Sequence, residues 1–128
     1  MTGSYRLAQD LIPAIDGMPR GLRAVVGSAL LREVVDMLAA LQEAVLHGGR
    51  GEALRRADVH LTRTRVLLRL AADQHAISTG IYEKACVRAD EIGRMLGGWL
   101  RSKTARGERP TQASGASDSG STGEARSS

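Results

Sequence analysis

The chain has 128 residues, a formal net charge of +4 and no Phe. This length favours one domain, and a core of Leu, Val, Ile, Ala and Met without Phe favours packed helices over a β-sandwich. The single cysteine, Cys86, excludes an internal disulfide, and its place among apolar positions predicts a small buried residue. No stretch approaches the ~20 apolar residues that span a bilayer, and residues 1–12 lack the features of a signal peptide, so we expect a cytoplasmic protein without membrane contact.

The first helical pattern is short. Leu7, Leu11 and Ile15 recur every four residues, as they do on one face of a helix. Pro13 lacks a backbone donor and clashes with the preceding turn, so we expect the helix to bend there or to begin near it. The Gly and Pro of residues 17–19 then break the helix.

The second helical pattern covers residues 20–47. Its apolar positions have helical spacing: Leu22, Val26, Leu30, Val34, Met37, Leu41 and Val45. Glycines within residues 48–51 end the pattern, because glycine adopts the left-handed backbone angles of helix ends without strain. Glu33 and Asp36 are interpreted as part of a solvated helix face.

The third helical pattern covers residues 52–74 and is apolar on two sides. One stripe consists of Leu54, Ala57, Leu61, Leu68, Ala71 and His75. A second stripe, well around the helix from the first, consists of Val59, Val66 and Leu70. A helix that is apolar on two sides is covered on two sides. We therefore expect the first stripe to pack within the chain and the second to contact another subunit.

The fourth helical pattern follows Ser78, whose hydroxyl is a suitable N-cap. Tyr82 and Glu83 lie in its first turns, and it ends near Lys103. Its apolar positions are Ile81, Ala85, Ile92, Met95, Leu96 and Trp99. Short loops between long amphipathic helices predict an all-α fold, an antiparallel up-down-up-down four-helix bundle over residues 1–103.

Residues 104–128 contain no Val, Ile, Leu, Met, Phe, Trp, Tyr or Cys. Such a segment cannot bury enough apolar surface to offset its chain entropy, which predicts a disordered tail. The tail is electrically neutral, so the surplus of positive charge belongs to residues 1–103.

Few residues suit catalysis or metal binding. The histidines are His47, His60 and His75, and Asp58 points to a different helix face from His60. The sequence has no HExxH or CxxC motif, and it has no recognisable nucleophile–base pair or phosphate-binding loop. It therefore predicts a protein that is not an enzyme and that needs no metal or cofactor.

Arginine placement is the feature with functional content. The basic side chains are nearly all arginine, whose forked guanidinium binds phosphate or carboxylate through two hydrogen bonds. Candidate contacts lie on the third and fourth helices: Arg55, Arg56, Arg63, Arg65, Arg69, Arg94 and Arg101. Such an array suits nucleic acid or an acidic protein surface. The alternative is a solvated face, partly neutralised by neighbouring carboxylates.

Residues 92–99 (Ile-Gly-Arg-Met-Leu-Gly-Gly-Trp) place three glycines inside a helix. Each costs about 1 kcal/mol relative to Ala, so close approach of another backbone is the expected reason. Gly93 and Gly97 share one face of the helix, and Trp99 beside them offers a large apolar surface. We assign Gly93, Gly97 and Trp99 to helix packing.

The same run resembles the end of the last helix in the accessory variability determinant (Avd) family of diversity-generating retroelements. The resemblance extends upstream and covers about residues 5 to 103 of the chain. The upstream residues are 11–20 (Leu-Ile-Pro-Ala-Ile-Asp-Gly-Met-Pro-Arg), Ala57 and Asp58 with Leu61, Arg65, Leu68, Arg69 and Leu70, and 75–78 with Tyr82 and Glu83.

The resemblance implies a barrel-like homopentamer of four-helix bundles. Such a protein binds the reverse transcriptase of its retroelement, binds RNA or DNA, and supports mutagenic cDNA synthesis. The candidate arginines would then contact phosphates or the polymerase, and Gly93, Gly97 and Trp99 would set the approach of helices. With two Tyr and one Trp to stack on bases, we expect little sequence preference. An alternative is an oligomeric scaffold of the type encoded in ribosomal-RNA intervening sequences, which engages only protein.

Overall fold

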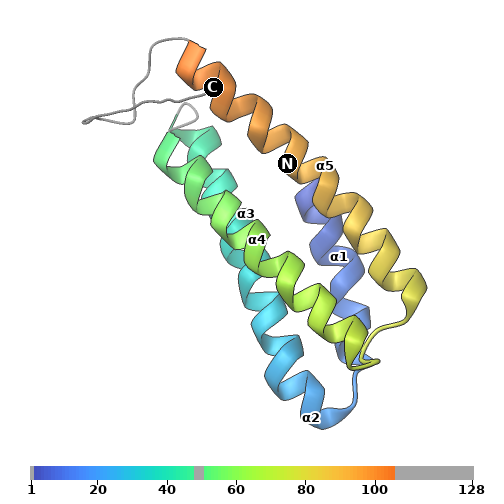
Figure 1. The fold of residues 1–128 in the computed structure, drawn as a ribbon. Coiled ribbons are helices and arrows are strands. Elements are labelled where there is room, and N and C mark those ends of the chain that lie inside the picture. The colour runs from blue at the N-terminus through green and yellow to red at the C-terminus, as the bar shows by residue number, and fades with distance from the viewer. Residues whose placement is uncertain (1, 48–50, 106–128) are drawn as a thin grey trace.

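The structure, a computed structural model, describes residues 2–47 and 51–105. Four long helical segments and no strand are found over these ranges (Figure 1). The segments are α1 (Thr2–Asp16), then α2 (Arg20–Leu22), η1 (Arg23–Gly27) and α3 (Ser28–Leu46) in one run, α4 (Gly51–Asp73) and α5 (Thr79–Ala105). The predicted all-α fold with four helices is confirmed. Nearly all of the predicted tail, from residue 106 onward, lies outside the described residues.

The first helix is longer than its sequence pattern indicated. It begins at Thr2 and continues through Pro13, so the alternative of a start near the proline is wrong. Pro13 lies on the exposed side of α1, where water can satisfy the carbonyl that loses its donor. The helix ends at Asp16, and the amide of Gly17 donates to the Pro13 carbonyl.

The second segment is not the single uniform helix that the spacing predicted. The residues Arg23–Gly27 form a π-helical turn between α2 and α3. Gly27 is buried in this turn, and an added Cβ would lie 2.8 Å from Ile15 Cγ2 and 3.2 Å from Met18 Sδ. A π turn takes up an extra residue within a helix. Here it brings a residue without a side chain against the end of α1.

The core is enclosed by four pairs of neighbouring helices, α1/α3, α3/α4, α4/α5 and α1/α5. Over the described ranges α1 does not pack against α4, nor α3 against α5, so these pairs lie diagonally across the core. The largest buried apolar side chains come from all four segments: Leu7, Leu11, Leu30, Met37, Leu41, Leu54, Leu68, Ile92 and Leu96. Burial of one such side chain stabilises the fold by about 1.5–3 kcal/mol.

His75 departs from the apolar stripe in which the spacing placed it. The other members of that stripe are buried, but His75 is exposed in the turn after α4 and has a φ of 58°. The amide of His75 donates to the Ala72 carbonyl, and the amide of Ala76 donates to the Ala71 carbonyl. These two bonds are those of a Schellman motif, in which the chain reverses after a residue with left-handed backbone angles.

The fourth helix begins as predicted, since the amide of Ile81 donates to Ser78 Oγ over 3.1 Å. α1 begins beside the middle of α5, where a Cβ added at Gly3 would lie 3.8 Å from Ile92 Cγ1 (Figure 1). From Ile92, α5 continues past the start of α1 to Ala105. No described helix has the length and apolar character that a membrane span requires.

Cys86 is only partly buried, which corrects the expectation of a buried thiol. It lies one turn after Tyr82 on α5, and a hydrogen bond between the two side chains raises the pKa of the Tyr82 hydroxyl. The thiol therefore faces a polar neighbour at the edge of the core.

Candidate functional site

The seven candidate arginines are all exposed, and three of those on α4 reach toward neighbouring helices. Arg56 and Arg63 of α4 reach toward α3. Arg65 of α4 reaches toward α5, which also holds Arg94 and Arg101. Five of the seven candidate arginines therefore lie on two separate surfaces, Arg56 and Arg63 on one and Arg65, Arg94 and Arg101 on the other.

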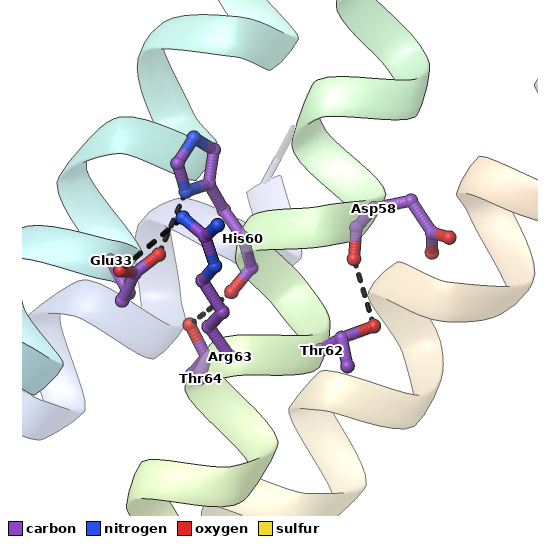
Figure 2. A network of polar contacts seen from close by, with 6 residues as sticks. All are labelled: Glu33, Asp58, His60, Thr62, Arg63 and Thr64. Atoms are coloured by element: carbon purple, nitrogen blue, oxygen red, sulfur yellow. Dashed lines mark hydrogen bonds and ion pairs between the residues drawn. The ribbon is translucent and has the colours of Figure 1, made fainter.

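The first surface, called the α3/α4 seam, consists of Glu33 and Glu43 of α3 with Arg56, His60 and Arg63 of α4. Arg56 Nη2 donates to Glu43 Oε2 over 2.7 Å, and this bond raises the pKa of the Arg56 guanidinium. His60 and Arg63 converge on Glu33, at 2.7 Å from His60 Nδ1 to Oε1 and 3.9 Å from Arg63 Nη1 to Oε2 (Figure 2). The Glu33 side chain is only 17% exposed, so its assignment to a solvated face is wrong.

Two threonines beside the seam donate to carbonyls of their own helix. Thr64 is fully buried, and its hydroxyl donates to the His60 carbonyl over 2.8 Å. Thr62 donates in the same way to the Asp58 carbonyl (Figure 2). The Asp58 side chain points away from the His60 ring in this view. Throughout residues 2–47 and 51–105, no three metal-ligating side chains converge.

The second surface, called the α4/α5 groove, is open to solvent and has a volume of about 580 Å³. It is lined by Arg65, Asp90, Gly93, Arg94, Gly97 and Arg101. Arg65 donates from Nη1 to Asp90 Oδ1 over 2.8 Å and from Nη2 to the Ala89 carbonyl over 3.2 Å. Arg94 and Arg101 form no ion pair with any described residue. The groove is therefore basic, with three arginines against one aspartate.

The glycines of the groove lie against guanidinium groups. A Cβ added at Gly93 would lie 3.0 Å from Arg65 Nη2 and 3.6 Å from Leu61 Cδ2. A Cβ added at Gly97 would lie 3.3 Å from Arg101 Nη1. Among the described residues, no backbone of another helix lies within 4 Å of either position, so the expected backbone approach is not found. Trp99 is half-buried and packs against the core.

The sequence was also compared with known families and curated proteins. A model of the bAvd-like family matches residues 3–103. The chain belongs to the bAvd-like family. The family resemblance stated from the residues is thereby confirmed, and the match spans all four helical segments. Among curated proteins, none matches the chain.

Other basic residues of this bAvd-like chain also divide into paired and unpaired groups. Arg69 pairs with Asp73 within α4 at 3.3 Å. Arg88 and Lys84, which were not among the candidate residues, both contact Asp10 of α1. The candidates Arg55, Arg94 and Arg101 form no ion pair with a described residue. Arg94 and Arg101 both line the α4/α5 groove.

Proposed function

We propose that this chain is a non-catalytic accessory protein of a diversity-generating retroelement. It binds the reverse transcriptase and nucleic acid in the cytoplasm through its exposed arginines, and it supports mutagenic cDNA synthesis. The observation behind this proposal is membership of the bAvd-like family over residues 3–103. The exposure of all seven candidate arginines supports a charge-driven surface rather than an enclosed site.

The proposed working form is a barrel-like homopentamer of antiparallel up-down-up-down bundles. In support, Val59, Val66 and Leu70 of α4 are 47%, 63% and 42% exposed. A second apolar side of a helix is usually covered by another surface, and here a second copy would cover it. A ring repeats each basic surface in every subunit, so a modest charge of +4 per chain becomes a stronger field.

A protein-only scaffold of the ribosomal-RNA intervening-sequence type is the second candidate. The observation that favours it is the pairing of four candidate arginines with carboxylates, which leaves less charge for phosphates. Such a scaffold would use the exposed apolar side chains of α4 and would bind nucleic acid weakly or not at all.

The test combines two measurements on the purified full chain. A labelled RNA duplex is titrated at several salt concentrations, and co-purification with the reverse transcriptase of the same retroelement is assayed after nuclease treatment. We expect both interactions, with log affinity falling by about 0.9 per phosphate contact for each unit of log salt. Polymerase binding without RNA binding at low salt would favour the scaffold, and the loss of both would overturn the proposal.

A further inference from the structure

The α4/α5 groove has the charge and shape that a sugar–phosphate backbone requires. We propose that Arg94 and Arg101 form the phosphate-binding part of the arginine array, beside Arg65, which Asp90 holds. Because Gly93 and Gly97 have no side chains to fill the groove, the backbone of a nucleic acid can reach the arginines that line it. This inference rests on the proposed binding of nucleic acid and specifies where on the chain it occurs.

The first support is the availability of charge. Arg94 and Arg101 form no ion pair with a described residue, whereas Arg56 contacts Glu43 at 2.7 Å in the α3/α4 seam. A guanidinium that already donates to a carboxylate has to give up that contact before it binds phosphate. A guanidinium without such a contact exchanges only water, so Arg94 and Arg101 bind phosphate better than the paired arginines of the seam.

The second support is spacing. Arg94 and Arg101 are one heptad apart on α5 and share a face. Seven residues of helix rise by about 10 Å. One strand of a DNA duplex places a phosphate every ~3.4 Å along its axis, so a strand lying along α5 presents phosphates to both arginines at once. Arg65 of α4 lies beside them, and its guanidinium is engaged by Asp90 and the Ala89 carbonyl.

The third support is the presence of Gly93 and Gly97 in the lining of the groove. The three glycines within residues 92–99 of α5 lower its intrinsic helix stability by about 1 kcal/mol each relative to Ala. Packing within the chain does not require Gly97, because among the described residues only Arg101 would touch a Cβ there. Close approach of a ligand to the backbone is a second reason for glycine in a helix. Larger side chains at Gly93 and Gly97 would fill the groove and displace the Arg65 and Arg101 guanidinium groups.

The lining favours a nucleic acid over an acidic protein. Protein interfaces depend on apolar or aromatic side chains that enter pockets, and the groove has a floor of glycine between arginines with no apolar anchor. It also has no aromatic ring on which a base could stack. Repeated phosphate charges match this surface, and they allow binding without sequence preference.

A matched pair of double variants tests the charge. Arg94→Gln with Arg101→Gln removes two charges from the groove, and Arg56→Gln with Arg63→Gln removes two from the seam. Each is titrated with a labelled RNA duplex at several salt concentrations, after its oligomeric mass and helical content are shown to equal those of the wild type. We expect the groove variant to lose about 0.9 of salt slope per phosphate contact removed, and the seam variant to keep the wild-type slope.

A second matched pair tests the shape without changing charge. Gly97→Leu fills the groove and displaces only the flexible end of Arg101. Gly98→Leu makes the same change at the next residue, where no described atom lies within 4 Å of an added Cβ. We expect Gly97→Leu to weaken RNA binding at low salt by about as much as the double groove variant, and Gly98→Leu to bind as the wild type does.

Several outcomes would overturn the proposal, and they can be told apart. If the seam variant loses RNA binding and the groove variant keeps it, the groove assignment fails while the proposed function stands. If the wild type binds no RNA at low salt, both fail. If the groove variants bind RNA normally but lose the reverse transcriptase, the partner of the groove is protein. If Gly97→Leu alone lowers the oligomeric mass, the groove is a contact between copies of the chain.

Discussion

The α3/α4 seam and the α4/α5 groove use the same residue type in different ways. In the α3/α4 seam, Arg56 and Arg63 meet carboxylates of the neighbouring helix, and the contacts join the two helices. In the α4/α5 groove, Arg65 meets Asp90 in the same way, but Arg94 and Arg101 pair with no described residue. Exposure is similar on both sides. What separates an arginine that holds the fold from one that can bind a ligand is whether a carboxylate already lies within reach.

The largest expected effect comes from removing the Glu33 carboxylate from the seam. Glu33→Ala should lower the free energy of unfolding by about 1–3 kcal/mol, because the His60 ring would keep a half-buried N–H without its acceptor. Urea denaturation at neutral pH measures this loss. RNA affinity of the folded variant should equal that of the wild type, since the seam lies outside the groove.

Asp36→Ala is the control for this change. Asp36 is exposed on the same helix and has no ion pair with a described residue. Its substitution should shift the free energy of unfolding by less than about 0.5 kcal/mol. An equal loss of stability in both variants would mean that the seam contributes nothing beyond helix charge.

Arg88 is also paired, with Asp10 of α1, and this pair gives a pH-dependent test. The hydrogen bond from Arg88 is the largest influence on Asp10 and holds the pKa of that carboxyl below its ordinary value. A carboxyl with a lowered folded pKa stabilises the fold above its unfolded pKa, and the contribution is lost as pH falls through the folded pKa. At neutral pH the wild type should exceed Asp10→Asn in free energy of unfolding by about 1–2 kcal/mol.

The pH profile of that difference separates a charge effect from lost packing. The difference should begin to shrink below about pH 4, near the unfolded pKa of Asp, and should be lost once Asp10 is protonated in the folded chain. Urea denaturation of both proteins at several pH values measures it. A difference that stays constant down to strongly acidic pH would contradict the role of the Arg88–Asp10 pair.

The turn between α4 and α5 is a reference region outside the seam and the groove. His75 occupies the left-handed position of a Schellman motif, where glycine is the usual residue. Relief of the steric conflict in His75→Gly should raise the free energy of unfolding by about 1 kcal/mol. His75→Ala keeps the conflict and should give no such gain in thermal unfolding. RNA affinity should not change in either variant, and a change would extend the binding surface to this turn.

Much of the fold was predictable because its signals are local. Leu7 and Leu11, like Leu61 and Leu68, face the core because helical spacing puts them on one side of their helix. The π-helical turn was not predictable. It depends on contact between Gly27 and the end of α1, which no spacing within one helix reveals.

The site was predictable only in part. The sequence identified the arginines, since residue type and exposed helical position are enough for that. It could not say which were paired, because Glu33 and His60 are 27 residues apart and Arg65 and Asp90 are 25 apart. The same limit applies to Gly93, whose neighbour is a guanidinium from α4 and not the expected backbone.

The smallest expected effect comes from a substitution that leaves a paired arginine without its carboxylate. Asp90→Asn removes the carboxylate that holds Arg65, and leaves the other residues of the groove unchanged. The two side chains are 42% and 58% exposed, so the loss of stability should not exceed about 1 kcal/mol. In the RNA titration, the freed Arg65 should steepen the salt slope by up to about 0.9, with a several-fold gain in affinity at low salt.

Asp73→Asn is the matched control, because it also raises the net charge by one and frees Arg69 of the same helix, which does not line the groove. If RNA affinity depends only on net charge, the two variants should gain affinity equally. That result would contradict a binding role specific to the groove. A larger gain for Asp90→Asn would show that position matters as well as charge. Arg65 would then bind phosphate because Arg94 and Arg101 lie beside it. Arg69, freed in the same way, would only be hydrated.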